Sequence, residues 1–305
     1  MIIVKIFQGP GNQMFQYAYG LAVSKRLGVE LKLDTSWYDE NSNHRSFILD
    51  RFNLKTEIAT AKEIECVKTL DGKNFLEYRF NLLRNRFASR HKKAVVTEDL
   101  SVYDKDLLSP NSTSYLEGYF TTQNFFQDFA LEVRNAFQFA GNAHSNVAEI
   151  ASKINQNTVA LSIRRGDFLG NPLHNICSIE YFKRAFDRVS QIDSNLELLI
   201  FSDDLEWVKE NMGFDVPHKF VSGVKDHMDH MRLMSMCKQH IIPNSTFSWW
   251  GAWLSGSSNV IAPDLWLTGD QKVHEKNFGH WVETRHTVPE NWIRIPAKLR
   301  GESTM

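Results

Sequence analysis

Residues 159–167 read VALSIRRGD, an apolar run that ends in two adjacent arginines. The run predicts a buried strand with Arg164 and Arg165 at its carboxyl end. A guanidinium is rarely buried without a partner, and its rigid fork matches the oxygens of a phosphate. Ligands of open α/β sheets bind beyond the carboxyl ends of the strands. Two interpretations follow: the arginines grip the diphosphate of a substrate, or Asp167 forms a surface ion pair with one of them.

Both halves of the chain alternate predicted strands with predicted helices, as in proteins built on parallel sheets. We expect strands at residues 2–7, 29–33, 159–163, 196–201, 219–221, 240–242 and 260–262. We expect helices at residues 14–28, 180–189, 205–211, 229–238 and 248–254. Residues 35–111 show only short helical patches. The sequence therefore predicts the α/β class.

The bulk composition predicts two domains and excludes several functions. The chain has 305 residues, 42% of them hydrophobic, and a net charge of -1. The small polar segment 141–146 predicts a boundary, with domains at residues 1–145 and 146–305. A balanced charge disfavours nucleic-acid binding. The three cysteines are widely spaced, which predicts neither a disulfide framework nor a zinc site and suits a reducing compartment.

A glycine-rich turn separates the first predicted strand from the first predicted helix. It reads Gly9-Pro10-Gly11-Asn12-Gln13. Glycine lets a ligand approach the backbone, and a helix N-terminus offers unpaired N–H groups to an anion. The spacing is not the dinucleotide fingerprint, because Met14 stands where the third glycine would be. A ligand-binding turn and a simple tight turn both remain open.

Two further polar stretches follow predicted strands. Asp203 and Asp204 come after the strand at 196–201, where they would bind a guanine edge, a sugar hydroxyl or a metal. Alternatively, Ser202 or Asp203 would cap the helix that begins near Leu205. Small polar side chains also mark the start of the last predicted helix, where they suit a phosphate. These are Asn244, Ser245, Thr246 and Ser248, interrupted by Phe247.

Two further stretches each allow a functional interpretation and a simpler structural one. Residues 226–230, DHMDH, contain metal-ligand types, but no third element matches them, and the first turn of a helix explains the acids equally well. Arginines and lysines between Arg79 and Lys93 alternate with apolar residues such as Phe80 and Leu83. That pattern predicts an amphipathic helix with a solvated face, or a surface that meets anionic lipid.

Four motifs together resemble the α-1,2-fucosyltransferases of glycosyltransferase family 11. They occur in family order and span residues 2–254, and the last is the longest and most specific. The motifs are residues 9–18 (GPGNQMFQYA), 163–168 (IRRGDF), 201–204 (FSDD) and 244–254 (NSTFSWWGAWL).

The resemblance implies a GT-B-like fold, with two Rossmann-like domains facing a cleft. Residues 1–145 would form the acceptor-side domain and residues 146–305 the nucleotide-sugar domain, with a C-terminal tail that packs back on the first. The donor would be GDP-β-L-fucose, transferred with inversion to O2 of a terminal galactose. No metal or other cofactor would be required, because arginines neutralise the departing diphosphate.

The resemblance also assigns residues to roles. Arg164 and Arg165 would bind the phosphates, with Asp167 either orienting them or acting as the general base. Asp203 would contact guanine. The remaining donor-binding residues would be Gly11, Asn12, Gln13, Ser162, Asp204, Asn244, Ser245, Thr246, Phe247 and Ser248. The family motif has histidine where this chain has Ser162, so nucleobase recognition is expected to differ.

The expected acceptor and cellular location rest on the same resemblance and on the N-terminal sequence. The N-terminus carries too short an apolar run for a signal peptide, and no stretch is long enough for a membrane span. We therefore expect a bacterial cytoplasmic enzyme, acting on a galactose-terminated oligosaccharide or lipid-linked glycan at the inner membrane face. The alternatives are a glycosyltransferase for another nucleotide sugar and a non-catalytic carbohydrate- or nucleotide-binding protein. A lectin would not need two phosphate-binding arginines.

Overall fold

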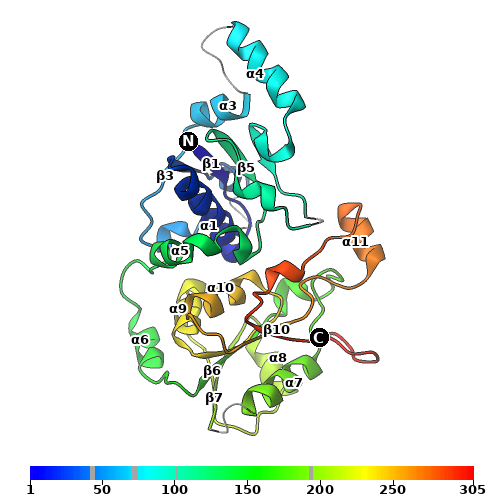
Figure 1. Cartoon of the computed structure of the whole chain (residues 1–305). Coiled ribbons are helices and arrows are strands. Elements are labelled where there is room, and N and C mark those ends of the chain that lie inside the picture. Colours follow the sequence, from blue (N-terminus) through cyan, green and yellow to red (C-terminus); the bar gives the residue numbers. More distant parts are fainter. Residues whose placement is uncertain (42–44, 70–74, 101, 192–194) are drawn as a thin grey trace. The chain divides into compact units, whose positions relative to one another are not determined.

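A computed structural model describes residues 1–41, 45–69, 75–100, 102–191 and 195–305. The chain divides into two compact units, Met1–Ala140 and Gly141–Met305, each built around one parallel sheet (Figure 1). The predicted boundary segment, residues 141–146, begins where the first unit ends. The predicted strands are all present within two residues of their expected bounds, and the α/β class is confirmed.

The sheet of the second unit has the strand order β11-β10-β9-β6-β7-β8. Its strands are β6 (Thr158–Ile163), β7 (Glu197–Ser202), β8 (His218–Phe220), β9 (Gln239–Ile241), β10 (Val260–Pro263) and β11 (Ile293–Ile295). The chain lays β7 and β8 on one side of β6 and then returns to place β9 on the other side. The order therefore reverses between β6 and β9, which is where open α/β sheets bind their ligands.

Helices cover both faces of this sheet, which explains why every residue of β6 is buried. Val159 and Leu161 pack into a cluster with Tyr181 and Phe182, and Ala160 packs into a second cluster with other side chains. The helices of the unit are α6 (Ser145–Ala151), α7 (Ile179–Ser190), α8 (Leu205–Asn211), α9 (His227–Met236), α10 (Thr246–Leu254) and α11 (Gln271–Phe278). The C-terminal tail bonds to the start of α7, through Ser178 and Glu302.

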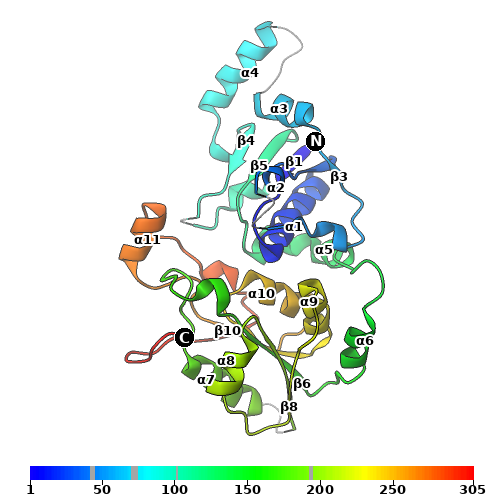
Figure 2. The same ribbon diagram turned by 180° about the vertical axis from the view of Figure 1, so that it is seen from behind.

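The first unit has a smaller sheet in the order β3-β2-β1-β5-β4. Its strands are β1 (Ile2–Lys5), β2 (Leu31–Asp34), β3 (Glu57–Ile58), β4 (Val95–Thr97) and β5 (Ser114–Glu117). Its helices are α1 (Pro10–Leu27), α2 (Trp37–Glu40), α3 (Ala61–Thr69), α4 (Phe75–Phe87) and α5 (Ala130–Ala136), seen from behind in Figure 2. Strands β3 and β4 lie inside the stretch expected to be irregular, because two or three residues are too few to show a period.

Candidate active site

The two arginines after β6 have different surroundings. Arg164 lies between two carboxylates, with its Nη2 2.7 Å from Asp167 Oδ1 and its Nη1 2.8 Å from Asp203 Oδ2. Its side chain is 34% exposed. The ion pair expected as one interpretation of Asp167 is therefore present. Because Arg164 remains partly open to solvent, an incoming anion can still reach its guanidinium.

Arg165 is held much more tightly. Its side chain is only 10% exposed, and its Nε lies 3.1 Å from Asp204 Oδ2. The guanidinium carbon lies 3.5 Å from the ring centroid of Trp207, in cation–π contact. The contact of Trp207 with Arg165 was not predicted from the sequence. The position of Trp207 three residues after Asp204, in the first turn of α8, is the signal that would have found it.

Asp203 joins the β6 loop to the end of β7. Its Oδ1 accepts the backbone N–H of Arg165 at 2.9 Å, while its Oδ2 pairs with Arg164. A Cβ on Gly166 would lie 2.5 Å from Asp203 Oδ2, so only glycine fits there without a shift. In this structure Asp203 orients the arginine loop, and its contact with guanine stays a prediction. Asp204 accepts the N–H of Trp207 at 3.3 Å and so caps α8, in place of the expected Ser202 or Asp203.

The N-terminus of α10 meets the end of β6. The hydroxyls of Ser162 and Ser248 lie 2.7 Å apart, and both side chains are buried. Ser245 is the N-cap residue, with Thr246 and Phe247 partly exposed in the first turn. The first N–H groups of a helix have no partner within it and favour an anion. The structure therefore brings the predicted arginines and the predicted phosphate-binding turn to one edge of the sheet.

Asn244 holds neighbouring loops together. Its side chain is buried, and Nδ2 donates to the carbonyl oxygens of His174 and Trp266, at 2.9 and 3.0 Å. It thereby joins the loops that follow β6, β9 and β10. His174 stacks on Phe168, with ring centroids 5.3 Å apart, and burial lowers the pKa of its imidazole. Both N–H groups of Asn244 are used inside the chain, so its predicted donor contact stays a prediction.

The remaining predicted donor residues belong to the first unit. Gly11, Asn12 and Gln13 lie in the first turn of α1, which begins at Pro10. Gln13 is buried, and its carboxamide bonds to the backbone at Gln8, Ser46 and Ile48. Gln13 thus shapes the loops around the turn, while Asn12 remains partly exposed.

The charge balance of the arginine cluster is negative. Two arginines, Arg164 and Arg165, face three carboxylates, Asp167, Asp203 and Asp204. This gives a net charge of −1. The carboxylates therefore repel an incoming anion, and this repulsion is offset where an arginine exchanges a carboxylate partner for the anion. Arg164 is the arginine whose exposure permits that exchange.

The acids and histidines near residue 226 serve the fold. Asp226 caps α9 by accepting the N–H of Met228, and Asp229 Oδ2 lies 2.7 Å from His144 Nδ1. Among the residues that the structure describes, no three histidines, cysteines or acids gather as metal ligands.

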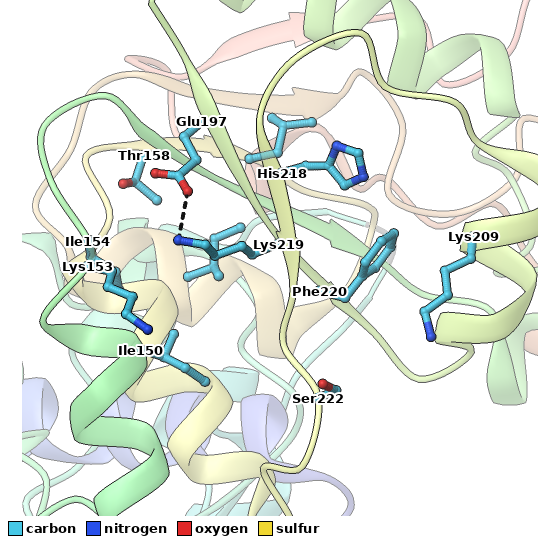
Figure 3. Close-up of a pocket in the computed structure, with 12 residues that line it drawn as sticks. Ile150, Lys153, Ile154, Thr158, Glu197, Lys209, His218, Lys219, Phe220 and Ser222 are labelled. Carbon is cyan, nitrogen blue, oxygen red and sulfur yellow. Dashed lines mark ion pairs between the residues drawn. The ribbon is translucent and has the colours of Figure 1, made fainter.

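A pocket of about 390 Å³ lies away from the arginines. Thr158, Glu197 and His218, which begin β6, β7 and β8, lie on its wall (Figure 3). Its lysines already have acidic partners, as Lys219 does with Glu197 at 3.1 Å. The pocket is thus at the opposite end of the strands from Arg164 and does not form part of the candidate site.

Comparison with known proteins agrees with this geometry. Residues 1–283 match the model of glycosyl transferase family 11. The chain is 29% identical to an alpha-1,2-colitosyltransferase of Escherichia coli, covering 97% of this chain and 99% of that protein. It is 31% identical to the O-antigen biosynthesis glycosyltransferase WbnK of Escherichia coli, covering 87% and 94%.

A solved structure supports the fold. The fucosyltransferase NodZ from Bradyrhizobium superposes with a TM-score of 0.50 at 10% identity, covering 83% of this chain and 92% of that chain. This likeness confirms the predicted GT-B-like class. The prediction that the two units face a common cleft stays a prediction. Because the family model matches residues 1–283, which is most of the chain, the chain belongs to glycosyltransferase family 11.

Proposed function

We propose that this chain transfers L-fucose from GDP-β-L-fucose to O2 of a terminal galactose, with inversion and without a metal ion. The observation that carries the proposal is the hydrogen bond between Ser162 and Ser248. It joins the arginine loop of β6 to the N-terminus of α10 at the point where the strand order reverses. Guanidinium groups and helix amides both suit a diphosphate.

Arg164 would act on the leaving group. In the free protein it is paired with Asp167 and Asp203. On donor binding it would exchange Asp167 for the β-phosphate, where negative charge grows as the glycosidic bond breaks. A hydrogen-bond donor placed in this way stabilises the transition state more than the ground state. Its loss typically costs about 100-fold or more in rate. Arg165, stacked on Trp207, would keep the loop in place.

Further donor contacts would come from α10. Ser245, Thr246 and Phe247, with the amides of the first turn of α10, would line the phosphates. Gly11 and Asn12 of the first unit remain predicted donor residues, and Gln13 supports their turn. The arginines and helix amides would supply the positive charge that a divalent cation supplies in other enzymes, so we expect activity to persist in EDTA.

The galactose hydroxyl must lose a proton during transfer. The exchange by Arg164 would release the carboxylate of Asp167, which could then accept that proton, or a phosphate oxygen could accept it. If Asp167 is the base, Asp167→Asn lowers kcat by about 100-fold or more and removes the acidic limb of the pH–rate profile. If Asp167 only orients Arg164, the substitution raises KM for the donor and the acidic limb persists.

A colitose donor is a second candidate, favoured by the likeness to an alpha-1,2-colitosyltransferase along 97% of this chain. Colitose is fucose without the 3-hydroxyl group. A site that hydrogen-bonds a hydroxyl strongly rejects the analogue that lacks it, whereas a site without such a contact does not. The ratio of kcat/KM for GDP-fucose and GDP-colitose therefore decides between the two donors.

The acceptor would be a galactose-terminated glycan, and the likeness to an O-antigen glycosyltransferase favours a lipid-linked precursor at the cytoplasmic face of the inner membrane. The test is product formation from GDP-fucose and a terminal β-galactosyl disaccharide in EDTA, with the linkage read by NMR. An α-1,2-linked product supports the proposal. A product that forms only with GDP-colitose assigns the second donor, and loss of activity in EDTA contradicts metal independence.

A further inference from the structure

Helix α4 of the first unit carries its apolar side chains on the outside. Leu76, Phe80, Leu83 and Phe87 are 79%, 64%, 57% and 79% exposed. At about 100° per residue, their spacing of four, three and four places them within about 60° of the helix circumference. Both views show α4 extending away from the sheet of its own unit (Figures 1 and 2). The four side chains form one continuous stripe, here called the apolar stripe, that faces solvent.

The opposite side of α4, which carries Asn85 together with the less exposed Tyr78 and Leu82, faces the body of the unit instead. Asn85 Oδ1 accepts the backbone N–H of Ala94 at 2.8 Å, just before β4. Asn81 and Asn85, which lie opposite the apolar stripe, are only partly exposed. An ordinary surface helix buries its apolar side and exposes its polar one. Because the four most exposed apolar side chains of α4 lie on its outer side, the apolar stripe does not stabilise the unit and is available to another surface.

Positive charge borders the apolar stripe on both sides. By helical spacing, Arg79 and Arg86 lie along one edge and Arg84 along the other. Residues 75–93 contain six arginines and lysines and one glutamate, a charge of +5. The whole chain carries -1, so the rest of it sums to −6. The basic character is therefore concentrated in this segment.

Two cations that follow the end of α4 already have partners within the unit. Arg90 Nη2 lies 2.8 Å from Asp99 Oδ2, and the Nζ of Lys92 donates to the carbonyl of Ser109. Arg84 and Arg86, by contrast, lie exposed on the helix. They are the charges that can meet an anionic surface together with the apolar stripe.

We propose that α4 binds flat on an anionic lipid bilayer, with the apolar stripe at the boundary of the acyl chains and its arginines among the lipid phosphates. A helix with an apolar side flanked by cations lies in the membrane interface. The apolar stripe spans 12 residues, with about 16 Å from the first to the last. A second copy of the chain is a poor occupant, because it would bring the same arginines together. Among the described helices, none is both long and apolar enough to cross a membrane, so this contact would be peripheral.

The test is co-sedimentation of the full chain with vesicles, and it needs no sugar substrate. The vesicles are phosphatidylcholine alone, or three parts phosphatidylcholine to one part phosphatidylglycerol. We expect binding only to the anionic vesicles, weakening as salt rises. Each cation near such a surface strengthens binding about fivefold, so Arg84→Glu with Arg86→Glu should weaken it by about 30-fold or more. Phe80→Glu with Leu83→Glu should abolish it.

Matched controls separate α4 from general charge and hydrophobicity. Lys55→Glu with Lys62→Glu makes the same charge change at exposed sites of the same unit. Leu131→Glu makes a single apolar-to-glutamate change of the same kind at a side chain 67% exposed on α5. We expect both controls to bind like the wild type, with unchanged thermal unfolding in every variant.

Three results would overturn the proposal. The first is no binding of the wild type to anionic vesicles at low salt. The second is an equal loss of binding in the controls and in the α4 variants. The third is a dimer in sedimentation velocity that Phe80→Glu with Leu83→Glu abolishes, which would assign the apolar stripe to a second copy. Because no activity is measured, each result leaves the proposed transfer reaction standing or falling on its own test.

Discussion

The hydroxyl of Ser162 touches the hydroxyl of Ser248 at 2.7 Å, with both side chains buried. Ser162 is the fifth residue of β6, and Ser248 lies in the first turn of α10. The contact fixes the distance between the arginine loop and the helix N-terminus. Where the resemblance implies a histidine, Ser162 packs beneath a helix.

Ser162→His should therefore destabilise the second unit. The imidazole is larger than the space beside Ser248, and overpacking a core typically costs about 1–3 kcal/mol. We expect a lower midpoint of urea unfolding and weaker binding of GDP. Ser162→Ala, which only removes the hydrogen bond, should cost about 1 kcal/mol. A Ser162→His variant of unchanged stability that binds GDP more tightly would show instead that the site has room for a base contact.

Gly166→Ala should impair catalysis more than stability. The added Cβ would lie 2.5 Å from Asp203 Oδ2, the oxygen that pairs with Arg164. Moving that carboxylate displaces the guanidinium that we assign to the leaving group. Because misplacing a catalytic group by about 1 Å can cost 100-fold in rate, we expect kcat/KM for the donor to fall at least about 10-fold.

The chain offers a matched control for this change. A Cβ on Gly213, in the same unit, meets nothing within 4 Å. Gly213→Ala should therefore keep the activity of the wild type. Equal activity of Gly166→Ala and Gly213→Ala would mean that the position of Asp203 does not matter to transfer.

The inner strands of the second unit's sheet, β6, β7, β9 and β10, were predictable because they are buried on both faces. Residues such as Val159 and Ile163 pack into one cluster while Ala160 packs into another, so the whole run is apolar in the sequence. Short edge strands carry no such signal. Strand β8 was still predicted, whereas the edge strands β3, β4 and β11, of two or three residues, were not. Strand β5, an inner strand of the first unit's sheet, was also missed.

The sequence predicted which residues form the site, but not which of them pair with one another. The motifs named Arg164, Arg165 and Asp167, and the structure shows them together with Asp203 and Asp204. Sequence spacing does not tell which carboxylate meets which arginine, because those contacts depend on the register of β6 and β7. The orientation of α4 was likewise undetermined, since a helical period does not say which side faces the body.

Trp207 should matter to catalysis through Arg165. The indole ring lies 3.5 Å from the guanidinium carbon, and a cation–π contact contributes about 0.5–2 kcal/mol. If Arg165 must stay in place for transfer, Trp207→Leu should lower kcat/KM by about 2- to 30-fold. Trp207→Phe keeps an aromatic face and should retain most of the activity. Equal loss in both variants would point to packing of α8 as the cause.

Glu98, which follows β4, should make the stability of the chain depend on pH. Its Oε2 accepts the backbone N–H groups of Tyr119 and Phe120, at 2.7 and 2.8 Å. Burial nevertheless raises the pKa of Glu98 to about 7. The folded state then holds this proton more tightly than the unfolded state, whose carboxyl has the ordinary value of 4.5. The free energy of unfolding should therefore fall as pH rises from about 4.5 to about 7, and stay lower above that.

Glu98→Gln isolates this contribution, because the amide oxygen can accept the same two N–H groups and does not ionise. Urea unfolding at pH 5 and pH 8 should show a loss of stability with pH in the wild type that exceeds the loss in the variant, by on the order of 2 kcal/mol. The comparison between the two proteins cancels other titrating groups. A wild type and variant with equal pH dependence would mean that Glu98 titrates at its ordinary pKa, with its charge stabilised by those two N–H groups.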